Sequence, residues 1–187
     1  MRVIAGEFRG RNLNFVSTEI LRPTADVVKE ALFTKLSFFF PINNFLDLFS
    51  GTGGIGIEAL SRGAKKVFFV EKNRNHANII ENNLKALKID YDKNNLNSTK
   101  RAVLFVGDYE TFLQSIDEKF DIIFIDPPYK SDFYDLSLNI IKERNILADD
   151  GLIVLEHDRD KKFTEETFEV VSQKKYGKRC LTYLSKK

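Results

Sequence analysis

Short apolar runs alternate with longer amphipathic stretches along most of this chain, and this alternation constrains its fold more than any other feature. Runs typical of buried strands occupy residues 45–49, 66–71, 102–108, 120–126 and 151–157. Between them lie stretches whose apolar residues recur at a helical spacing, such as Ile80, Leu84 and Leu87. Strands that alternate with helices predict an α/β protein with a doubly wound, mostly parallel sheet and helices on both faces.

The two ends of the chain have different patterns. Residues 168–185 predict two more strands around a basic turn at Gly177, which makes seven strands in all. This turn is too short for a crossover helix, so the last two strands should pair antiparallel at one edge of the sheet. Residues 1–15 predict a small hairpin and residues 22–36 an amphipathic helix, while the polar, Asn-rich residues 90–100 predict a loop. We therefore expect one domain over residues 1–187, with a hairpin appendage (1–20) and a core (21–187).

Composition and charge limit the cellular context. Cys180 is the single cysteine, which excludes an intramolecular disulfide and fits a reducing compartment. We see no leader pattern and no apolar run of membrane-spanning length, so we expect a cytoplasmic protein. The chain has two histidines and no Cys/His cluster, so no metal is expected. The net charge of +2 includes six basic residues and no acid in residues 170–187, which allows a polyanionic partner but fits a solubilising tail equally well.

A glycine-rich turn follows the first predicted core strand. In "LDLFSGTGGIG", Gly51, Gly53 and Gly56 fit the pattern G-x-G-x-x-G, and Glu71 ends the next predicted strand. This pattern alone is typical of nicotinamide-dinucleotide sites. However, Asp47 lies close to the expected ligand position, where its carboxylate would repel a pyrophosphate and attract an ammonium group. The sequence therefore favours a ligand with an amino-acid end.

S-adenosylmethionine matches these groups, because it joins an amino acid to adenosine. Its ammonium group would lie near Asp47, and its chain would pass over the backbone of Gly51 and Gly53. Glu71 would bind the two ribose hydroxyls. Asp108, at the end of the third predicted core strand, would accept a hydrogen bond from the adenine amino group. We therefore predict S-adenosylmethionine as the cofactor.

The fourth core strand runs directly into the sequence "DPPY" at residues 126–129. Methyl transfer from a sulfonium depends mainly on alignment, since the leaving group is already good. The Asp126 carboxylate and the Pro127 carbonyl are two acceptors that can stabilise the positive charge that develops on an exocyclic amine. Pro127 and Pro128 hold this corner rigid, and Tyr129 offers a flat face on which an extruded base can stack.

The acid at position 126 also favours one base. A carboxylate offers only acceptors, whereas guanine presents two adjacent donors, the ring N1–H and the 2-amino group. The sequence therefore predicts guanine N2 as the methyl acceptor. Adenine N6, cytosine N4 and a protein glutamine amide stay open as alternatives, because related corners serve them. The modest basic charge favours a structured RNA or ribonucleoprotein over long duplex DNA.

Taken together, "DLFSGTGGIGIEALSRGA", "VEKN", "GD" and "DPPY" resemble class I S-adenosylmethionine-dependent N-methyltransferases. The N-terminal "RVIAGEFRGRNL" and "RPTADVVKEALF" narrow this resemblance to the RsmD family, bacterial 16S rRNA guanine-N2 methyltransferases whose usual target is position 966. The resemblance covers almost the whole chain. It implies the 16S rRNA or the small ribosomal subunit as the partner.

The resemblance also implies roles for residues near the N-terminus. Arg22 and Thr24 would lie beside the cofactor and the base pocket, Thr24 toward the cofactor and Arg22 toward the RNA. Arg9 and Arg11 would touch RNA phosphates. The family often has a further basic residue and a Ser in the helix after "RPT", where this chain has Ala25 and Val28, so this helix itself is not expected to grip RNA.

Two other classes of function compete with a methyltransferase. A nicotinamide-dependent oxidoreductase would use the glycine turn but leaves Asp47 and the D-P-P-Y corner unexplained. A non-catalytic RNA-binding assembly factor would have no use for either motif. We expect a monomeric enzyme.

Overall fold

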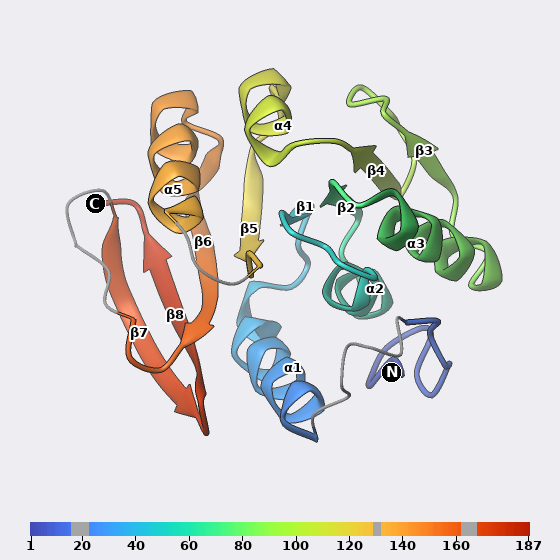
Figure 1. Ribbon diagram of the computed structural model, residues 1–187, viewed down its shortest axis with the longest axis horizontal. Coiled ribbons are helices and arrows are strands. Elements are labelled where there is room, and N and C mark those ends of the chain that lie inside the picture. The colour runs from blue at the N-terminus through green and yellow to red at the C-terminus, as the bar shows by residue number, and fades with distance from the viewer. Residues whose placement is uncertain (16–22, 129–131, 162–167) are drawn as a thin grey trace.

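The computed structural model describes residues 1–15, 23–128, 132–161 and 168–187 (Figure 1), and the side chains of residues 23–25 lie outside this description. One eight-stranded sheet forms the centre, in the order β3-β4-β2-β1-β5-β6-β8-β7. The strands are β1 (Asn44–Asp47), β2 (Lys66–Glu71), β3 (Tyr91–Lys93), β4 (Ala102–Val106), β5 (Phe120–Ile125), β6 (Leu147–Asp158), β7 (Glu169–Tyr176) and β8 (Arg179–Ser185). The α-helices are α1 (Pro23–Leu36), α2 (Gly54–Ser61), α3 (Arg74–Ala86), α4 (Tyr109–Ser115) and α5 (Phe133–Arg144), and a 3-10 helix covers Ser37–Phe39.

The pairing confirms the predicted α/β fold with its mostly parallel sheet. Strands β1 to β6 run parallel, and β1 lies between β2 and β5, with Phe45 opposite both Val67 and Ile122. The last two strands form the predicted antiparallel pair, with β7 at the edge and β8 between β6 and β7. We call β7, β8 and the turn between them the C-terminal ribbon.

The prediction of seven strands was wrong by one. The extra strand, β3, lies in the segment predicted as a loop and pairs with β4 at the opposite edge of the sheet. It has three residues, Tyr91, Asp92 and Lys93, of which two are charged. A strand this short shows no readable alternation, and charged side chains are common on edge strands because they discourage pairing with other chains.

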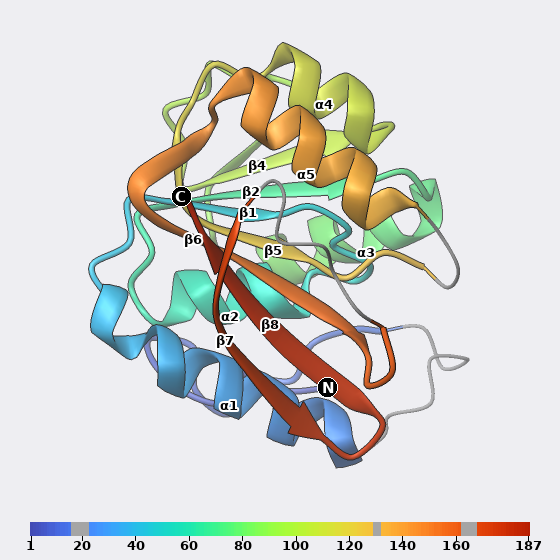
Figure 2. The same ribbon diagram turned by 90° about the vertical axis from the view of Figure 1, so that its left-hand side faces the viewer.

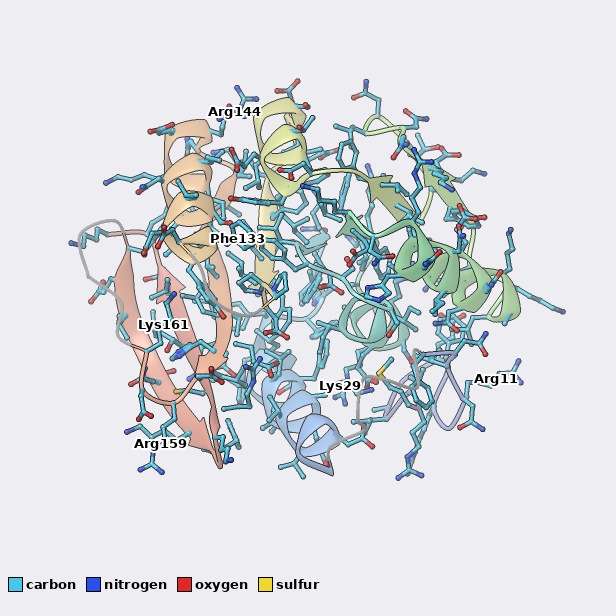
Figure 3. The ribbon with its side chains drawn as sticks, in the orientation of Figure 1. Arg11, Lys29, Phe133, Arg144, Arg159 and Lys161 are labelled. Carbon is cyan, nitrogen blue, oxygen red and sulfur yellow. The ribbon has the colours of Figure 1, made fainter. Side chains whose placement is uncertain are left out.

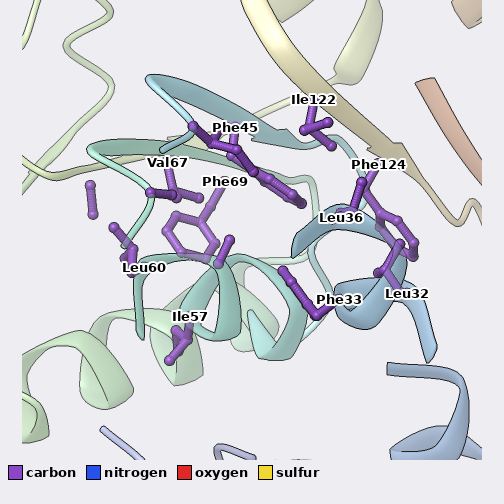
Figure 4. Close-up of a cluster of buried hydrophobic side chains, with 14 of the residues drawn as sticks. Leu32, Phe33, Leu36, Phe45, Ile57, Leu60, Val67, Phe69, Ile122 and Phe124 are labelled. Carbon is purple, nitrogen blue, oxygen red and sulfur yellow. The ribbon is translucent and has the colours of Figure 1, made fainter. Parts of the chain in front are cut away.

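Two apolar layers enclose the sheet. Helices α1, α2 and α3 pack on one face and α4 and α5 on the other (Figure 2). Phenylalanine rings fill much of the first layer (Figure 4), where the ring centroids of Phe33 and Phe45 lie 6.3 Å apart. The rings of Phe68 and Phe120 meet edge to face in the second layer, with centroids 5.2 Å apart. Buried rings on both faces fix the sheet between the helices, so the loops at its edges have a rigid support.

The N-terminal segment, residues 1–15, is built onto helix α2. It forms the predicted hairpin, which is closed by a single antiparallel bridge, Arg2 opposite Asn12. The backbone amide of Phe8 donates to the Ser61 hydroxyl at 2.9 Å. A Cβ on Gly6 would lie 1.8 Å from the carbonyl oxygen of Ser61, and the φ of Gly6 is +85°. Only glycine suits this close, left-handed approach, and the segment therefore docks tightly against the C-terminal end of α2.

A buried carboxylate anchors the same segment. Glu58 is fully buried, and its oxygens accept hydrogen bonds from the amides of Ile4 (2.8 Å) and Ala5 (3.0 Å). Lys29 and Arg62 balance its charge at 3.5 and 2.8 Å. Burial lowers the pKa of Lys29, and the Glu58 carboxylate opposes this shift. Because two amides and two cations share one buried acid, the N-terminal segment, α1 and α2 are tied into one unit.

Within the described ranges, no helix combines the length and the apolar character needed to cross a membrane.

Candidate active site

Four of the predicted site residues lie at the carboxyl ends of adjacent strands. Asp47 ends β1 and Glu71 ends β2, while Asp108 follows β4 and Asp126 follows β5. These strands are neighbours in the order β4-β2-β1-β5. Ligands of open parallel sheets bind at this edge, where the chain connections diverge to opposite sides. The fold thus brings together four acids that are far apart in the sequence.

The glycine turn joins β1 to α2 with an open backbone. Gly51 (φ +52°) and Gly53 (φ +84°) both have left-handed conformations, and a Cβ on Gly51 would meet no atom within 4 Å. Gly56 is different, because a Cβ there would lie 2.3 Å from the Phe69 ring. The turn is fastened by Ser50, whose hydroxyl donates to the Asp47 carbonyl and accepts from the Val70 amide. Gly51 therefore offers bare backbone to a ligand, whereas Gly56 serves packing.

Asp47 is a buried acid with spare hydrogen-bonding capacity. Its side chain is 1% exposed, and Oδ2 accepts a 3.0 Å hydrogen bond from the Gly56 amide. Burial, with a smaller contribution from the nearby charge of Glu71, raises the pKa of Asp47 to about 7, and the Gly56 hydrogen bond opposes this rise. A carboxylate accepts more than one hydrogen bond, so Asp47 can still bind a cationic group, which would in turn stabilise its charged form.

Glu71 already holds the glycine turn. Its Oε2 accepts from the Gly51 amide at 2.8 Å and its Oε1 from the Asn73 amide at 2.7 Å. Each oxygen keeps a second lone pair. Glu71 therefore shapes the turn and can also accept from two vicinal hydroxyls.

Asp108 is the N-cap of helix α4. Its Oδ1 accepts from the Glu110 amide at 3.0 Å, and Lys72 donates to Oδ2 at 2.8 Å. The hydrogen bond from Lys72 lowers the pKa of Asp108. These contacts give Asp108 a structural role beside any role in binding, and they keep it ionised.

Asp126 has a partner that the sequence pattern does not predict. Arg179, at the start of β8, donates from Nη2 to Asp126 Oδ1 at 2.6 Å. It also donates from Nε to Glu156 at 2.9 Å and from Nη1 to Asp158 at 3.3 Å. One guanidinium thus connects the D-P-P corner to β6 and β8. The sequence offers only a weak indication of this contact. Glu156 and Asp158 alternate along one strand, and they face Arg179 only in the observed register of β6 and β8.

The surroundings of Asp126 shift its protonation. Burial and the nearby charge of Glu156 raise the pKa of Asp126, and the Arg179 guanidinium opposes this. Because 36% of the Asp126 side chain remains exposed, water moderates the shift. Arg179 therefore acts against the upward shift of the Asp126 pKa and favours the ionised form.

Three aromatic rings, which the sequence motifs do not include, gather near the same edge. The ring centroid of Phe49, after β1, lies 5.0 Å from that of Tyr109 and 6.0 Å from that of Phe133. Figure 3 labels Phe133 among the central side chains. Tyr109 begins α4 and Phe133 begins α5. The Tyr109 hydroxyl is buried with no hydrogen-bond partner among the described residues. These rings form an apolar wall between the Asp108 and Asp126 strand ends.

The remaining predicted site residues are placed unevenly. Arg9 and Arg11 are both exposed on the N-terminal segment, and Figure 3 shows Arg11 at the edge of the molecule. Tyr129 and Arg22 lie outside the described residues, and for Thr24 the structure describes the backbone only, within α1. Across the described residues, no group of three or more His, Cys, Asp or Glu side chains is arranged to hold a metal.

Sequence comparisons match nearly the whole chain. A family model described as "Conserved hypothetical protein 95" matches residues 1–185. The Haemophilus influenzae protein "Ribosomal RNA small subunit methyltransferase D" is 36% identical over 180 residues, which cover 95% of this chain and 89% of that protein. The Escherichia coli K12 protein of the same name is 32% identical over 158 residues, covering 84% and 75%.

Solved structures show the same similarity. A proposed methylase from Haemophilus influenzae superimposes with a TM-score of 0.79 at 32% identity, covering 100% of this chain and 99% of that one. A proposed methyltransferase from Escherichia coli gives a TM-score of 0.83 at 28% identity, covering 100% and 98%. The family match and the full-length similarity agree with the motifs, and the chain therefore belongs to the Conserved hypothetical protein 95 family, the RsmD family.

Proposed function

We propose that this protein transfers a methyl group from S-adenosylmethionine to the exocyclic N2 amine of a guanine in 16S rRNA, by family resemblance position 966. The observation that carries the proposal is the row of acids at the ends of β4, β2, β1 and β5, with the D-P-P corner at its end. The names of the Haemophilus and Escherichia relatives support ribosomal RNA as the substrate class.

The cofactor site would use six predicted residues. Asp47 has unused acceptor capacity for the cofactor's ammonium group, and the open space beside Gly51 allows a close approach of ligand and backbone. Gly53 would contribute its backbone to the same site, although its own Cβ position faces Ile80 at 3.1 Å. Glu71 and Asp108 would accept from the ribose and the adenine, and Thr24 would lie beside them. When bound, S-adenosylmethionine supplies an electrophilic methyl group. The protein's part is then to hold donor and acceptor in line.

The base site would centre on Asp126. Arg179 occupies Oδ1, which leaves Oδ2 and the Pro127 carbonyl for the two adjacent N–H donors of guanine. As N2 is methylated it gains positive charge, and these two acceptors stabilise it. Pro128 stiffens the corner, and Tyr129 would stack on the extruded base.

The alternatives fit the site less well. A dinucleotide pyrophosphate would lie against the buried Asp47 carboxylate, which disfavours a nicotinamide-dependent oxidoreductase. Adenine is a weaker candidate for the methylated base. Its N6 amine lies beside a ring nitrogen that accepts hydrogen bonds, so a carboxylate pairs with adenine less fully than with guanine.

The wider assignments follow from the substrate. Arg9, Arg11 and Arg22 would contact RNA phosphates, and residues 1–187 would act as one methyltransferase domain. We propose a monomer that works in the cytoplasm, where ribosomal RNA is found.

Two measurements on the intact protein test this proposal. Calorimetry should detect binding of S-adenosylmethionine but not of NADH. Unmethylated small ribosomal subunits and deproteinised 16S rRNA should then be compared as acceptors of labelled methyl groups. NADH binding without S-adenosylmethionine binding would contradict the proposal, and the comparison of acceptors identifies the natural substrate form.

Arg179 gives a pH prediction. Replacing Arg179 with Gln removes the group that lowers the pKa of Asp126, so this pKa should rise. Asp126 is then protonated, and inactive as an acceptor, up to a higher pH. We expect the acid limb of the pH profile of kcat/KM to move upward by about one pH unit or more, with activity largely restored in alkaline buffer.

Arg179→Lys is the matched control, because it keeps the positive charge and should shift the limb less. If Arg179→Gln instead lowers kcat/KM by the same factor at every pH, Arg179 has a structural role alone and the prediction is contradicted.

A further inference from the structure

We propose that the tip of the C-terminal ribbon is an RNA-phosphate docking surface, formed by the exposed side chains of Arg159, Lys174, Lys175 and Lys178. We call these four residues the basic tip. This inference rests on the proposed function and adds a contact surface to it, on the opposite side of the catalytic corner from Arg9 and Arg11.

The basic tip is a local concentration of positive charge. All four side chains are exposed. The Arg159 amide donates to the Lys178 carbonyl at 2.9 Å, and this hydrogen bond holds the chain after β6 beside the turn between β7 and β8. Figure 3 shows Arg159 directed away from the protein. Two acids, Asp158 and Asp160, flank Arg159 in the sequence, and Asp158 is hydrogen-bonded to Arg179. The four cations therefore outnumber the acids beside them.

The tip is joined to the catalytic corner by one residue. Arg179 follows the ribbon turn directly and binds Asp126. In the sheet register, Ile125 pairs with Leu155, so Asp126 is level with Glu156, which pairs with Leu181. Gly177 lies four residues before Leu181, and at about 3.3 Å per residue the tip extends about 13 Å beyond the corner.

This reach suits RNA. A guanine extruded into the corner stays attached to its own backbone, so the flanking phosphates must pass within a few nucleotides of Asp126. The corner itself is acidic, because three acids, Asp126, Glu156 and Asp158, all pair with the same guanidinium of Arg179. Such a corner repels phosphates, and cations a short distance away offset this while leaving the acceptors free for the base.

A charge-matched pair of variants tests the docking surface. The first replaces the basic tip with Gln at all four positions. The control replaces Lys65, Lys100, Lys119 and Lys142 with Gln, four exposed residues near the amino ends of the strands or at the adjoining end of α5. Both variants lose the same charge. The probe is a 16S rRNA fragment that contains the proposed target guanine, and its affinity is measured as a function of salt.

We expect the tip variant to bind this RNA at least about tenfold more weakly, with the slope of log K against log salt reduced by about three. The control should keep nearly the wild-type slope, and both variants should keep the wild-type affinity for S-adenosylmethionine. Equal slopes in the two variants would overturn the docking surface. Loss of methyl transfer by the wild-type protein would instead overturn the proposed function, since the salt slopes are measured without catalysis.

Discussion

Replacing Asp126 with Asn is expected to reduce methyl transfer by about a hundredfold or more while leaving cofactor binding unchanged. The change is nearly isosteric, but it replaces one acceptor oxygen with an N–H donor. Guanine and Arg179 both present N–H donors to this side chain. An amide can offer its oxygen to only one of them, so its NH2 group would face the other donor. Removing one preorganised electrostatic contact of this kind typically costs a factor of about 10² to 10³ in rate.

The result is read from single-turnover rates with saturating cofactor on unmethylated subunits. Arg179 keeps its bonds to Glu156 and Asp158 in this variant, so the fold should persist, and thermal unfolding checks this. Full activity on guanine in the variant would refute the role given to the carboxylate.

Replacing Glu58 with Gln is expected to lower the free energy of unfolding by about 3–5 kcal/mol. The substitution leaves Lys29 buried beside a neutral amide, at a side-chain exposure of 5%. In addition, the NH2 group of Gln would face the backbone N–H of either Ile4 or Ala5, which would then lose its acceptor. The loss should appear as a lower urea midpoint with an unchanged slope.

Two further variants locate the effect. Asp117→Asn removes an acid that is 93% exposed and paired with Arg144, so it should change stability little. Lys29→Met combined with Glu58→Gln should recover part of the loss, since the unpaired buried charge is gone. A single Glu58→Gln variant as stable as the wild type would contradict the anchoring role of this acid.

The sequence predicts most of the elements that place the site. Strand β2 matches its predicted bounds, and the acids at positions 47, 71, 108 and 126 lie at or just past strand ends as expected. Such features are local, because a buried parallel strand must be apolar and a polar residue marks its end. The glycine turn is readable for the same reason, since its left-handed conformations require glycine.

What the sequence did not reveal depends on contacts between distant segments. Arg179 reads as one more basic residue near the C-terminus, and its link to Asp126 exists only once β8 lies beside β6. Glu58 looks like an ordinary surface acid on a helix until the N-terminal segment covers it. The rings of Phe49, Tyr109 and Phe133 follow three separate strands. Residue patterns within one element cannot report such meetings.

The most direct test of the account is the identity of the methylated nucleoside. Small ribosomal subunits that lack base methylation are incubated with the protein and methyl-labelled S-adenosylmethionine, and their RNA is digested to nucleosides. The account predicts label in N2-methylguanosine, with almost none when Asp126→Asn replaces the wild type. Label in N6-methyladenosine or N4-methylcytidine, or no transfer by a protein that clearly binds the cofactor, would contradict it.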